Sequence, residues 1–485
     1  MTKIKNKLLL GLVALAAFSS CKKSFIELNP PTSVSPQEAF QTEGDMLIAL
    51  RGAYAGLRGA DFYGRTVPVI GDVMADNEYQ SSTNTNRYTT YNNYTYISND
   101  GNATGMWNTG YQVILRTNNI INSTTVPPSV NVNQYKGEAY AIRALAYFTM
   151  VRYFARPYTD NPAGLGLPII TKYDPDFKPG RNTVAEVYTQ INKDLDSAYS
   201  NMTTAAAFNS SQFSKYAAKG LQAKVYLTMG DYPKARVAAD DVINNGKFTM
   251  VGTDSWAGYW SDPAPKTAPT AAATGKLETL FEVSSDAVNN LQFDALPYLY
   301  SQFGNYGDFL MTDSAKGVMP LYIPADIRLS TFPRMKRANS TSSTALTISA
   351  INKYPAIQGD RSDTKVLRYT EMYLIAAEAT YLSDPTASLG YLKNVTDKRG
   401  VPAIVSVGAA LFEDIITERR KELAAEGDRY MDLQRLKRDI SRPNDYTNPA
   451  PKTIAYSNYR RVLPIPQAEL DVNAAIRSQQ NPGGY

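Results

Sequence analysis

The sequence contains no histidine among its 485 residues. This absence excludes Ser-His-Asp and Cys-His nucleophilic sites, and it excludes zinc sites that use an imidazole ligand. It also removes the side chain that most often transfers protons near neutral pH. Carboxylate pairs, Ser-Lys arrangements and cations held by oxygen atoms remain as possible chemistry. The composition therefore favours a protein that is not an enzyme and has no cofactor.

Cysteine occurs once, at Cys21, so the chain cannot form an internal disulfide bond. It follows three lysines and a short apolar run over residues 8–17. Such a run cannot span a bilayer, which takes about 20 residues, and it predicts an export signal over residues 1–20. A lone cysteine at that junction is where bacterial lipoproteins carry their lipid. We expect the mature chain to begin at an acylated Cys21, held at a membrane surface; the alternative is an ordinary signal peptide.

The net charge of the chain is also small. The leader holds three lysines and no acidic residue, so its removal lowers the net charge from +5 to +2. After Cys21 no basic run extends beyond Lys22 and Lys23. A charge this small on so long a chain predicts no nucleic-acid partner.

Apolar residues at helical spacing cover most of the chain and predict a mostly α-helical protein. Residues 38–58 form one such segment, with Ser35 as the expected N-cap. Residues 138–154 are apolar on nearly every side, which predicts a buried helix. The helical pattern resumes from about Met106, and Trp107 is expected to pack in the core.

Residues 214–243 follow the small-large alternation of a tetratricopeptide helix-turn-helix. The turn is expected at Gly230–Asp231, and Pro233 suits the first turn of the second helix. A weaker copy over residues 368–395 breaks at Asp384–Pro385. Because solenoid repeats need about three neighbours for a continuous core, further helices are expected around these pairs. The pattern predicts a tetratricopeptide-like helical-repeat scaffold.

Tyrosine is in clear excess, with 34 residues, and it gathers in two regions without helical periodicity. Residues 61–110 are expected to form a long surface excursion, and residues 250–350 an irregular, loop-rich lobe. Sugar rings pack on aromatic planes, while their hydroxyls bond amides and carboxylates. For each aromatic residue, core or partner contact competes with ligand contact. The predicted ligand-binding residues are Asp76, Asn77, Tyr79, Arg87, Tyr88, Tyr91, Tyr94, Trp256, Tyr259, Trp260 and Tyr298.

Two acidic groups invite other interpretations. Glutamates 418, 422 and 426 share one helix stripe, and Glu371 and Glu378 share another. Such carboxylates could hydrolyse a glycoside, but internal pairing with arginines of the same helices is favoured because buried charges need partners. Residues 72–78 could offer oxygen ligands to calcium, yet their spacing matches no twelve-residue calcium loop, and no metal site is predicted.

Several separated motifs resemble, in order, those of the SusD/RagB family of Bacteroidetes outer-membrane lipoproteins. The resemblance covers essentially the whole mature chain. The motifs are LNPPTSVSPQEAF and IALRGAYAGL near the start, RALAYFTMVRYF, AAKGLQAKVYLTMGDYPKA and VLRYTEMYLIAAEA in the repeat helices, and ITERRKELAAEGDRYMDLQRLK with LPIPQAEL and NPGGY at the end.

The resemblance implies a SusD-like fold and a lipoprotein that faces the cell exterior. Such a protein caps a SusC-like TonB-dependent transporter β-barrel as a hinged lid and delivers oligosaccharides, or peptides in some members. It divides the chain into an N-terminal region over residues 21–228 and a C-terminal region over residues 229–485. Relatives exported to the cell surface often carry acidic residues directly after the cysteine, whereas here the nearest acid is Glu27.

Three functions follow from these observations. We favour a lipid-anchored protein that binds a glycan, or a peptide, without catalysis. The first rival is a surface hydrolase that uses carboxylates. The second is a repeat scaffold that binds only other proteins.

Overall fold

The computed structural model describes most of the chain beyond residue 38. The leader, Cys21 and Ser35 lie outside the described residues, so what the sequence predicts for them stays a prediction. The described ranges are residues 39–204, 209–261, 278–286, 288–302, 307–339, 342–355 and 362–485.

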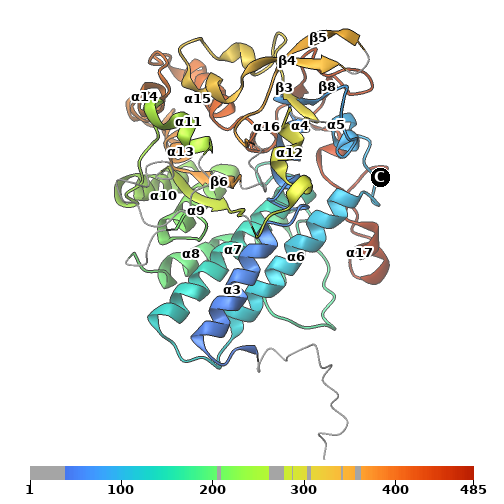
Figure 1. Cartoon of the computed structure of the whole chain (residues 1–485). Helices are drawn as coiled ribbons and strands as arrows, with labels where there is room; N and C mark the ends of the chain where they lie inside the picture. The colour runs from blue at the N-terminus through green and yellow to red at the C-terminus, as the bar shows by residue number, and fades with distance from the viewer. Residues whose placement is uncertain are drawn as a thin grey trace, which may run out of the picture.

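Long helices form the framework, and the fold is mostly α with helical-repeat pairs, as predicted. In Figure 1, α3, α6, α7 and α8 lie side by side, and α9, α10, α13 and α14 continue the stack. The long helices are α3 (Glu43–Leu57), α6 (Gly101–Asn122), α7 (Val130–Phe154), α8 (Val184–Asn201), α9 (Lys215–Met229), α10 (Tyr232–Asn245), α13 (Tyr369–Thr380), α14 (Pro385–Arg399) and α15 (Gly408–Glu422).

Shorter elements build the lobe that covers one end of this framework (Figure 1). The short helices are α4 (Thr66–Val73), α5 (Thr89–Asn93), α11 (Trp256–Ser261), α12 (Leu296–Tyr300), α16 (Arg429–Arg435) and α17 (Gln467–Val472), with single turns at Thr253–Ser255, Gln292–Asp294, Met319–Leu321, Ile327–Thr331 and Tyr459–Arg461. The strands pair antiparallel as β1 (Glu78–Gln80) with β3 (Phe309–Met311), β2 (Thr279–Val283) with β6 (Thr364–Arg368), β4 (Arg334–Asn339) with β5 (Ser342–Ser349), and β7 (Ile440–Ser441) with β8 (Thr453–Ile454).

Helix α3 begins later than the sequence predicts. The Thr42 hydroxyl accepts a hydrogen bond from the Asp45 backbone N–H (3.2 Å), and the Thr42 N–H donates to the Asp45 carboxylate (2.8 Å). This reciprocal capping pair fixes the helix start at Glu43. The prediction of one continuous helix over residues 38–58 is therefore wrong in its first turn.

The tetratricopeptide-like pairs are confirmed. Between α9 and α10, Gly230 adopts a left-handed backbone (φ +76°), and the Asp231 carboxylate accepts from the backbone N–H of Lys234 (3.3 Å). A residue with a Cβ would be strained at that φ, so glycine suits the turn. The second pair repeats this arrangement, because Asp384 caps α14 through the N–H of Ala387 (3.0 Å).

Helix α7 lies in the middle of the framework, between α6 and α8. Its residues from Gly137 to Val151 are buried at every position except Tyr140, which confirms the buried helix that the sequence predicts. Trp107 of α6 is buried as well, and its ring meets that of Phe154 edge-on, with centroids 5.2 Å apart. Among the described residues no helix is long and apolar enough to cross a membrane.

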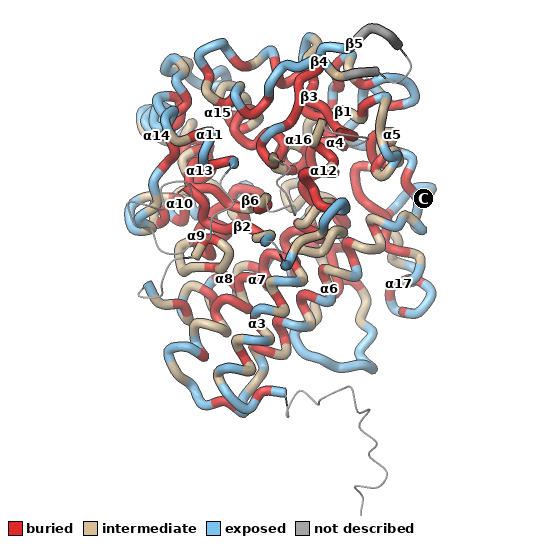
Figure 2. Tube along the Cα trace, in the orientation of Figure 1, coloured by how far each residue is buried: buried red, intermediate tan, exposed pale blue. Residues whose placement is uncertain are grey.

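Residues 61–110 do not form the surface excursion that the sequence predicts. All residues of α4 are buried, and Figure 2 shows α4 together with α12 and β3 inside the lobe. The guanidinium of Arg442 donates to the backbone carbonyls of Val73 (2.8 Å), Ala75 (3.0 Å) and Asn92 (2.6 Å). A residue near the far end of the chain thus satisfies polar groups of this segment and allows its burial.

A cluster of buried charges ties the lobe to the helices. The Glu422 carboxylate pairs with Arg328 (3.1 Å), Arg368 (2.8 Å) and Arg399 (2.8 Å), and Glu278 pairs with the last two at 2.5 and 3.2 Å. Burial alone would raise the pKa of Glu422, but the neighbouring guanidiniums, that of Arg399 most strongly, outweigh burial and hold this pKa well below its usual value. The Glu422 carboxylate is therefore ionised, and three guanidiniums share its charge.

Replacing Glu422 by glutamine tests this cluster. Three guanidiniums would stay buried with one negative charge fewer, so we expect the free energy of unfolding to fall by about 3–5 kcal/mol. Urea denaturation followed by circular dichroism measures the change. Glu413→Gln on the same helix is the matched control, because its pair with Arg438 is solvent-exposed and such pairs contribute less than about 1 kcal/mol. Equal losses in the two variants would contradict the role of the cluster.

Glu138 of α7 predicts a pH dependence of stability. Its carboxylate accepts from the Tyr54 hydroxyl of α3 (2.6 Å) and from Gln134 (2.9 Å), while burial raises its pKa from 4.5 to about 7. Between these two pH values the folded state keeps a proton that the unfolded state has lost. The stability from this group is thus complete below about pH 4.5 and is lost as the pH rises to about 7.

We therefore expect Glu138→Gln to flatten the pH profile of unfolding. Relative to wild type, the variant should gain on the order of 2 kcal/mol between pH 5 and pH 7, since one pKa unit corresponds to about 1.4 kcal/mol. Urea midpoints measured across this range give the difference. Glu413→Gln should run parallel to wild type, and a parallel profile for Glu138→Gln would rule out the assignment.

Candidate functional site

Most of the aromatic residues predicted for ligand binding are buried. Tyr88, Tyr91 and Tyr94 bury their rings and satisfy their hydroxyls inside the protein. Tyr94 donates to the carbonyl of Met74 (2.6 Å), and Tyr91 donates to the carboxylate of Asp100 (2.5 Å). Because the hydroxyl finds a partner in the core, the whole side chain can leave the solvent. The expected exposed surface is not built from these three residues.

Trp256, Tyr259 and Trp260 on α11 are buried too, which corrects the expectation of an opposing aromatic platform. Trp256 lies over the guanidinium of Arg399, 4.5 Å from the ring centroid, and Trp260 lies over the ammonium of Lys353 at 4.7 Å. The Tyr259 hydroxyl bonds that of Thr279 (2.9 Å). These rings cover the buried charge cluster through cation–π contacts.

Asp76 and Asn77 are also inside the protein. Burial alone would raise the pKa of Asp76, but Arg429 (2.7 Å) and Arg420 (3.4 Å) lower it to about 2. Asn77 accepts from Arg420 (2.8 Å). The two side chains thus join the segment before β1 to α15 and α16. Within the described ranges no group of three or more acidic or cysteine side chains is placed to hold a metal ion.

Three of the predicted residues keep exposed surface. Tyr79 is half-buried on β1, beside the ring of Tyr446 (6.4 Å between centroids). Arg87 and Tyr298 are half-buried, and the segment between β2 and α12 links them. The structure thus brings Arg87 and Tyr298 to one surface and places Tyr79 apart from it.

We call this surface the aromatic shelf; it consists of Arg65, Arg87, Phe293, Asp294 and Tyr298. The Asp294 carboxylate pairs with Arg65 (3.0 Å) and Arg87 (3.3 Å), and Arg87 also donates to the carbonyl of Phe293 (3.4 Å). The rings of Phe293 and Tyr298 are 5.1 Å apart, and Phe293 is 59% exposed. The shelf thus places two neighbouring aromatic rings beside paired charges, an arrangement that can serve as a contact surface.

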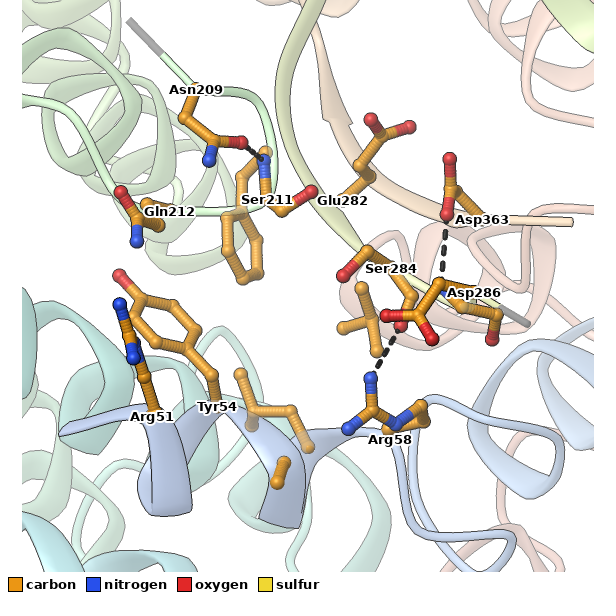
Figure 3. A pocket seen from close by; sticks show the side chains of 15 residues that line it. Arg51, Tyr54, Arg58, Asn209, Ser211, Gln212, Glu282, Ser284, Asp286 and Asp363 are labelled. Carbon is orange, nitrogen blue, oxygen red and sulfur yellow. Dashed lines mark hydrogen bonds between the residues drawn. The ribbon is translucent and has the colours of Figure 1, made fainter. Parts of the chain in front are cut away.

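A hollow, here named the polar cleft, adjoins this segment (Figure 3). Its volume is about 380 Å³, within the range of small-ligand sites of about 300–1,000 Å³. Its walls come from helix α3, residues 209–212, the end of β2 and residues 284–286. The polar lining residues are Arg51, Tyr54, Arg58, Asn209, Ser211, Gln212, Glu282, Ser284, Ser285, Asp286 and Asp363.

The ring of Phe281 forms the apolar floor of the cleft, and fixed polar groups form its rim. The ring of Phe281 stacks on that of Phe213, with centroids 4.0 Å apart. Arg58 donates to the carbonyl of Ser284 (3.0 Å), and the Asp363 carboxylate accepts from the N–H of Ser285 (2.9 Å), as Figure 3 shows. The rim is therefore organised before any ligand arrives, which lowers the entropy lost on binding.

The shelf and the cleft are connected through a close backbone contact at Gly64. The N–H of Leu296 donates to the Gly64 carbonyl (3.1 Å). A Cβ at Gly64 would lie 2.1 Å from the carbonyl oxygen of Arg58 and 2.6 Å from the side chain of Leu291. Glycine thus lets the turn after α3 pack against the segment that carries Phe293 and Asp286. One segment positions both parts of the site.

The arrangement suits binding of a polyhydroxylated ring. Guanidinium and amide donors, carboxylate acceptors and exposed or floor aromatic rings are all present. The backbone N–H of Asn289 (2.7 Å) lowers the pKa of Asp286, which is the opposite of what a general acid needs. The internal pairing predicted for the acidic motif is confirmed, because Arg419 of α15 meets Glu371 of α13 at 3.5 Å.

Sequence reasoning missed Arg58, Phe293 and Asp286. Arg58 stands at the end of an ordinary amphipathic helix, and its role depends on a carbonyl more than two hundred residues away. The available signal was the amide-rich turn DAVNN at residues 286–290, followed closely by Phe293. Asx turns and an apolar ring in a segment without periodicity are typical of a binding loop.

Comparison with known proteins agrees with the motifs. A family model described as "Starch-binding associating with outer membrane" matches residues 25–227, and one described as "SusD family" matches residues 334–485. The chain is 28% identical to SusD-like protein P2 of Formosa agariphila, over 97% of this chain and 98% of that protein. It is 24% identical to SusD-like protein P38 of the same organism, over 91% and 93%.

Solved structures share the fold. A SusD superfamily protein from Bacteroides thetaiotaomicron superposes with a TM-score of 0.80 at 29% identity, covering 91% of this chain and 100% of that one. A structure titled putative sugar binding protein, from Bacteroides vulgatus, gives 0.81 at 27% identity, covering 92% and 100%. Motifs, family models and fold lead to one conclusion: the chain belongs to the SusD/RagB family of Bacteroidetes.

Proposed function

We propose that this protein is a lipid-anchored binding protein of the outer membrane that captures oligosaccharides at the cell exterior. It hands them to a SusC-like TonB-dependent transporter, over which it acts as a lid, and it does not catalyse a reaction on them. The observation that carries the proposal is the joint surface of the aromatic shelf and the polar cleft.

The chemistry of this surface supports a sugar ligand. Phe293 and Tyr298 offer ring faces for the C–H groups of a sugar, and Arg87 and Asp294 border them. The cleft adds donors and acceptors for hydroxyl groups over an apolar floor. The matching family model is described as starch-binding and the similar Bacteroides vulgatus protein as a putative sugar binding protein, which supports the same class of ligand. A peptide is the alternative, and it becomes an outcome of the binding test.

A glycan panel tests the binding site. Thermal unfolding of the mature protein should shift upward with at least one oligosaccharide, because a ligand that binds the folded state stabilises it. Phe293→Ala should weaken binding of that glycan about tenfold, since an aromatic contact contributes roughly 1 kcal/mol beyond its buried area.

Phe177→Ala is the matched control for this test. Phe177 is also a half-exposed phenylalanine, but it borders a different hollow, beside Trp107. Its loss should leave glycan binding unchanged. A shift with peptides alone would replace the sugar by a peptide ligand, and no shift with either would refute the site.

Replacing Cys21 by serine tests the anchor. The variant lacks the sulfur that carries the acyl chains, so it should move from the membrane fraction to the soluble fraction, because each buried methylene contributes about 0.8 kcal/mol to membrane binding. Detergent-solubilised wild type should copurify with a large β-barrel. Recovery of the wild type alone, or membrane retention of the variant, would count against the lid role or the anchor respectively.

A further inference from the structure

A second hollow lies next to the polar cleft and has a distinct lining. It holds about 1,040 Å³ and shares Arg51, Asn209 and Gln212 with the cleft. Helix α3, the first half of α7, the start of α9 and the turn after α10 enclose it. We call it the second cavity.

Three basic side chains line the second cavity: Arg51, Lys215 and Lys247. In the part of the chain that the structure describes, none of the three forms an ion pair, although Lys215 lies 4.3 Å from the ring centroid of Tyr199. In the buried cluster around Glu422, by contrast, the arginines are paired with carboxylates. Arg51 and Lys247 are exposed and Lys215 is half-buried, and unpaired positive charges that line one cavity favour an anionic occupant.

The described lining of the second cavity contains few acidic residues. Glu138 is the one acidic lining residue among those described, and it is buried with its carboxylate engaged by Tyr54 (2.6 Å) and Gln134 (2.9 Å). Because burial raises its pKa to about 7, it carries little charge below neutral pH. Two further carboxylates accept hydrogen bonds from lining amides: Glu43 accepts from Asn131, and Asp241 accepts from Asn245. They hold the amides in place as part of the wall.

The remaining lining resembles that of a sugar site. Aromatic side chains and amides line the cavity, which suits ring faces and hydroxyl groups. Lys247 has a left-handed backbone (φ +56°), an unusual conformation for a lysine in the turn that closes α10. Strained residues of this kind persist where the surrounding structure holds them, and they gather at binding sites. The aromatic and amide lining residues are Asn131, Gln134, Tyr135, Asn209, Gln212, Phe213, Tyr216, Asn244, Asn245 and Phe248.

From this geometry we infer that the second cavity binds an anionic sugar unit, one that carries a carboxylate or a sulfate group, and that Lys215 and Lys247 contact the anionic group. The inference rests on the proposed function and narrows it, because it names acidic oligosaccharides as the preferred ligands. Arg51 lies at the junction with the polar cleft, so one oligosaccharide can occupy both hollows.

The test uses the mature lipoprotein in detergent and isothermal titration calorimetry. The probes are an oligogalacturonate, its methyl ester, and a sulfated galactan oligosaccharide, with neutral glycans from the panel as references. The acid and its ester share a shape and differ in charge. We expect at least one anionic probe to bind about tenfold more tightly than the methyl ester, as charge-assisted hydrogen bonds allow. Affinity should fall with added salt.

The double variant K215Q/K247Q assigns the site. It should weaken binding of the anionic probe about tenfold and leave neutral glycans at the aromatic shelf unaffected. K172Q, at an exposed lysine outside both hollows, is the matched control. An unchanged melting temperature shows that the variants fold.

Each outcome decides between the two ideas. Equal affinity for the acid and its ester would overturn the inference about the second cavity, and so would an affinity for the anionic probe that is unchanged in K215Q/K247Q. Either result would leave the proposed function standing. Failure of every glycan, neutral or acidic, would overturn both. Preference for the sulfated probe over the oligogalacturonate, or the reverse, identifies which anionic group the lysines recognise.

Discussion

The structure depends on the shared ionisation of Glu422. This carboxylate serves three buried guanidiniums that come from the lobe, from β6 and from the end of α14. Taking such charges out of water costs several kcal/mol per ion, so they remain buried only while all partners are in place. The rings of Trp256 and Trp260 cover the guanidinium of Arg399 and its neighbours and keep water away. The irregular lobe is therefore fixed to the helices as one body.

The buried charge cluster also positions the residues of the candidate site. Glu278 immediately precedes β2, and its pairs with Arg368 and Arg399 hold this strand against β6. The end of β2 leads directly to Ser284 and Asp286, which form the rim of the polar cleft. A binding surface carried by loops can stay precise only when the elements behind the loops are rigid. Here an ionic core gives an otherwise irregular segment a fixed base.

Local patterns predicted those parts of the fold whose stabilising partners are close in sequence. The turn at Gly230, the cap at Asp384 and the buried α7 all follow from spacing over a few residues. The tyrosine-rich segment could not be predicted in this way, because the groups that satisfy it come from Arg442 at the far end of the chain. The same applies to the cleft, where Arg58 meets Ser284. The spacing of apolar residues shows which face of a helix is apolar, but it does not show which distant segment packs on that face.

Composition misled the choice of binding residues for a definable reason. A tyrosine suits a wet surface, but its hydroxyl also finds partners in the interior, as Tyr94 does at Met74. Tyrosine enrichment therefore cannot separate core from surface. Phenylalanine has no polar tip, so leaving Phe293 largely exposed carries a hydrophobic penalty with no hydrogen bond in return. Buried tyrosines beside an exposed phenylalanine reverse the usual order of hydropathy, and this reversal is one reason why we propose the aromatic shelf as part of the ligand site.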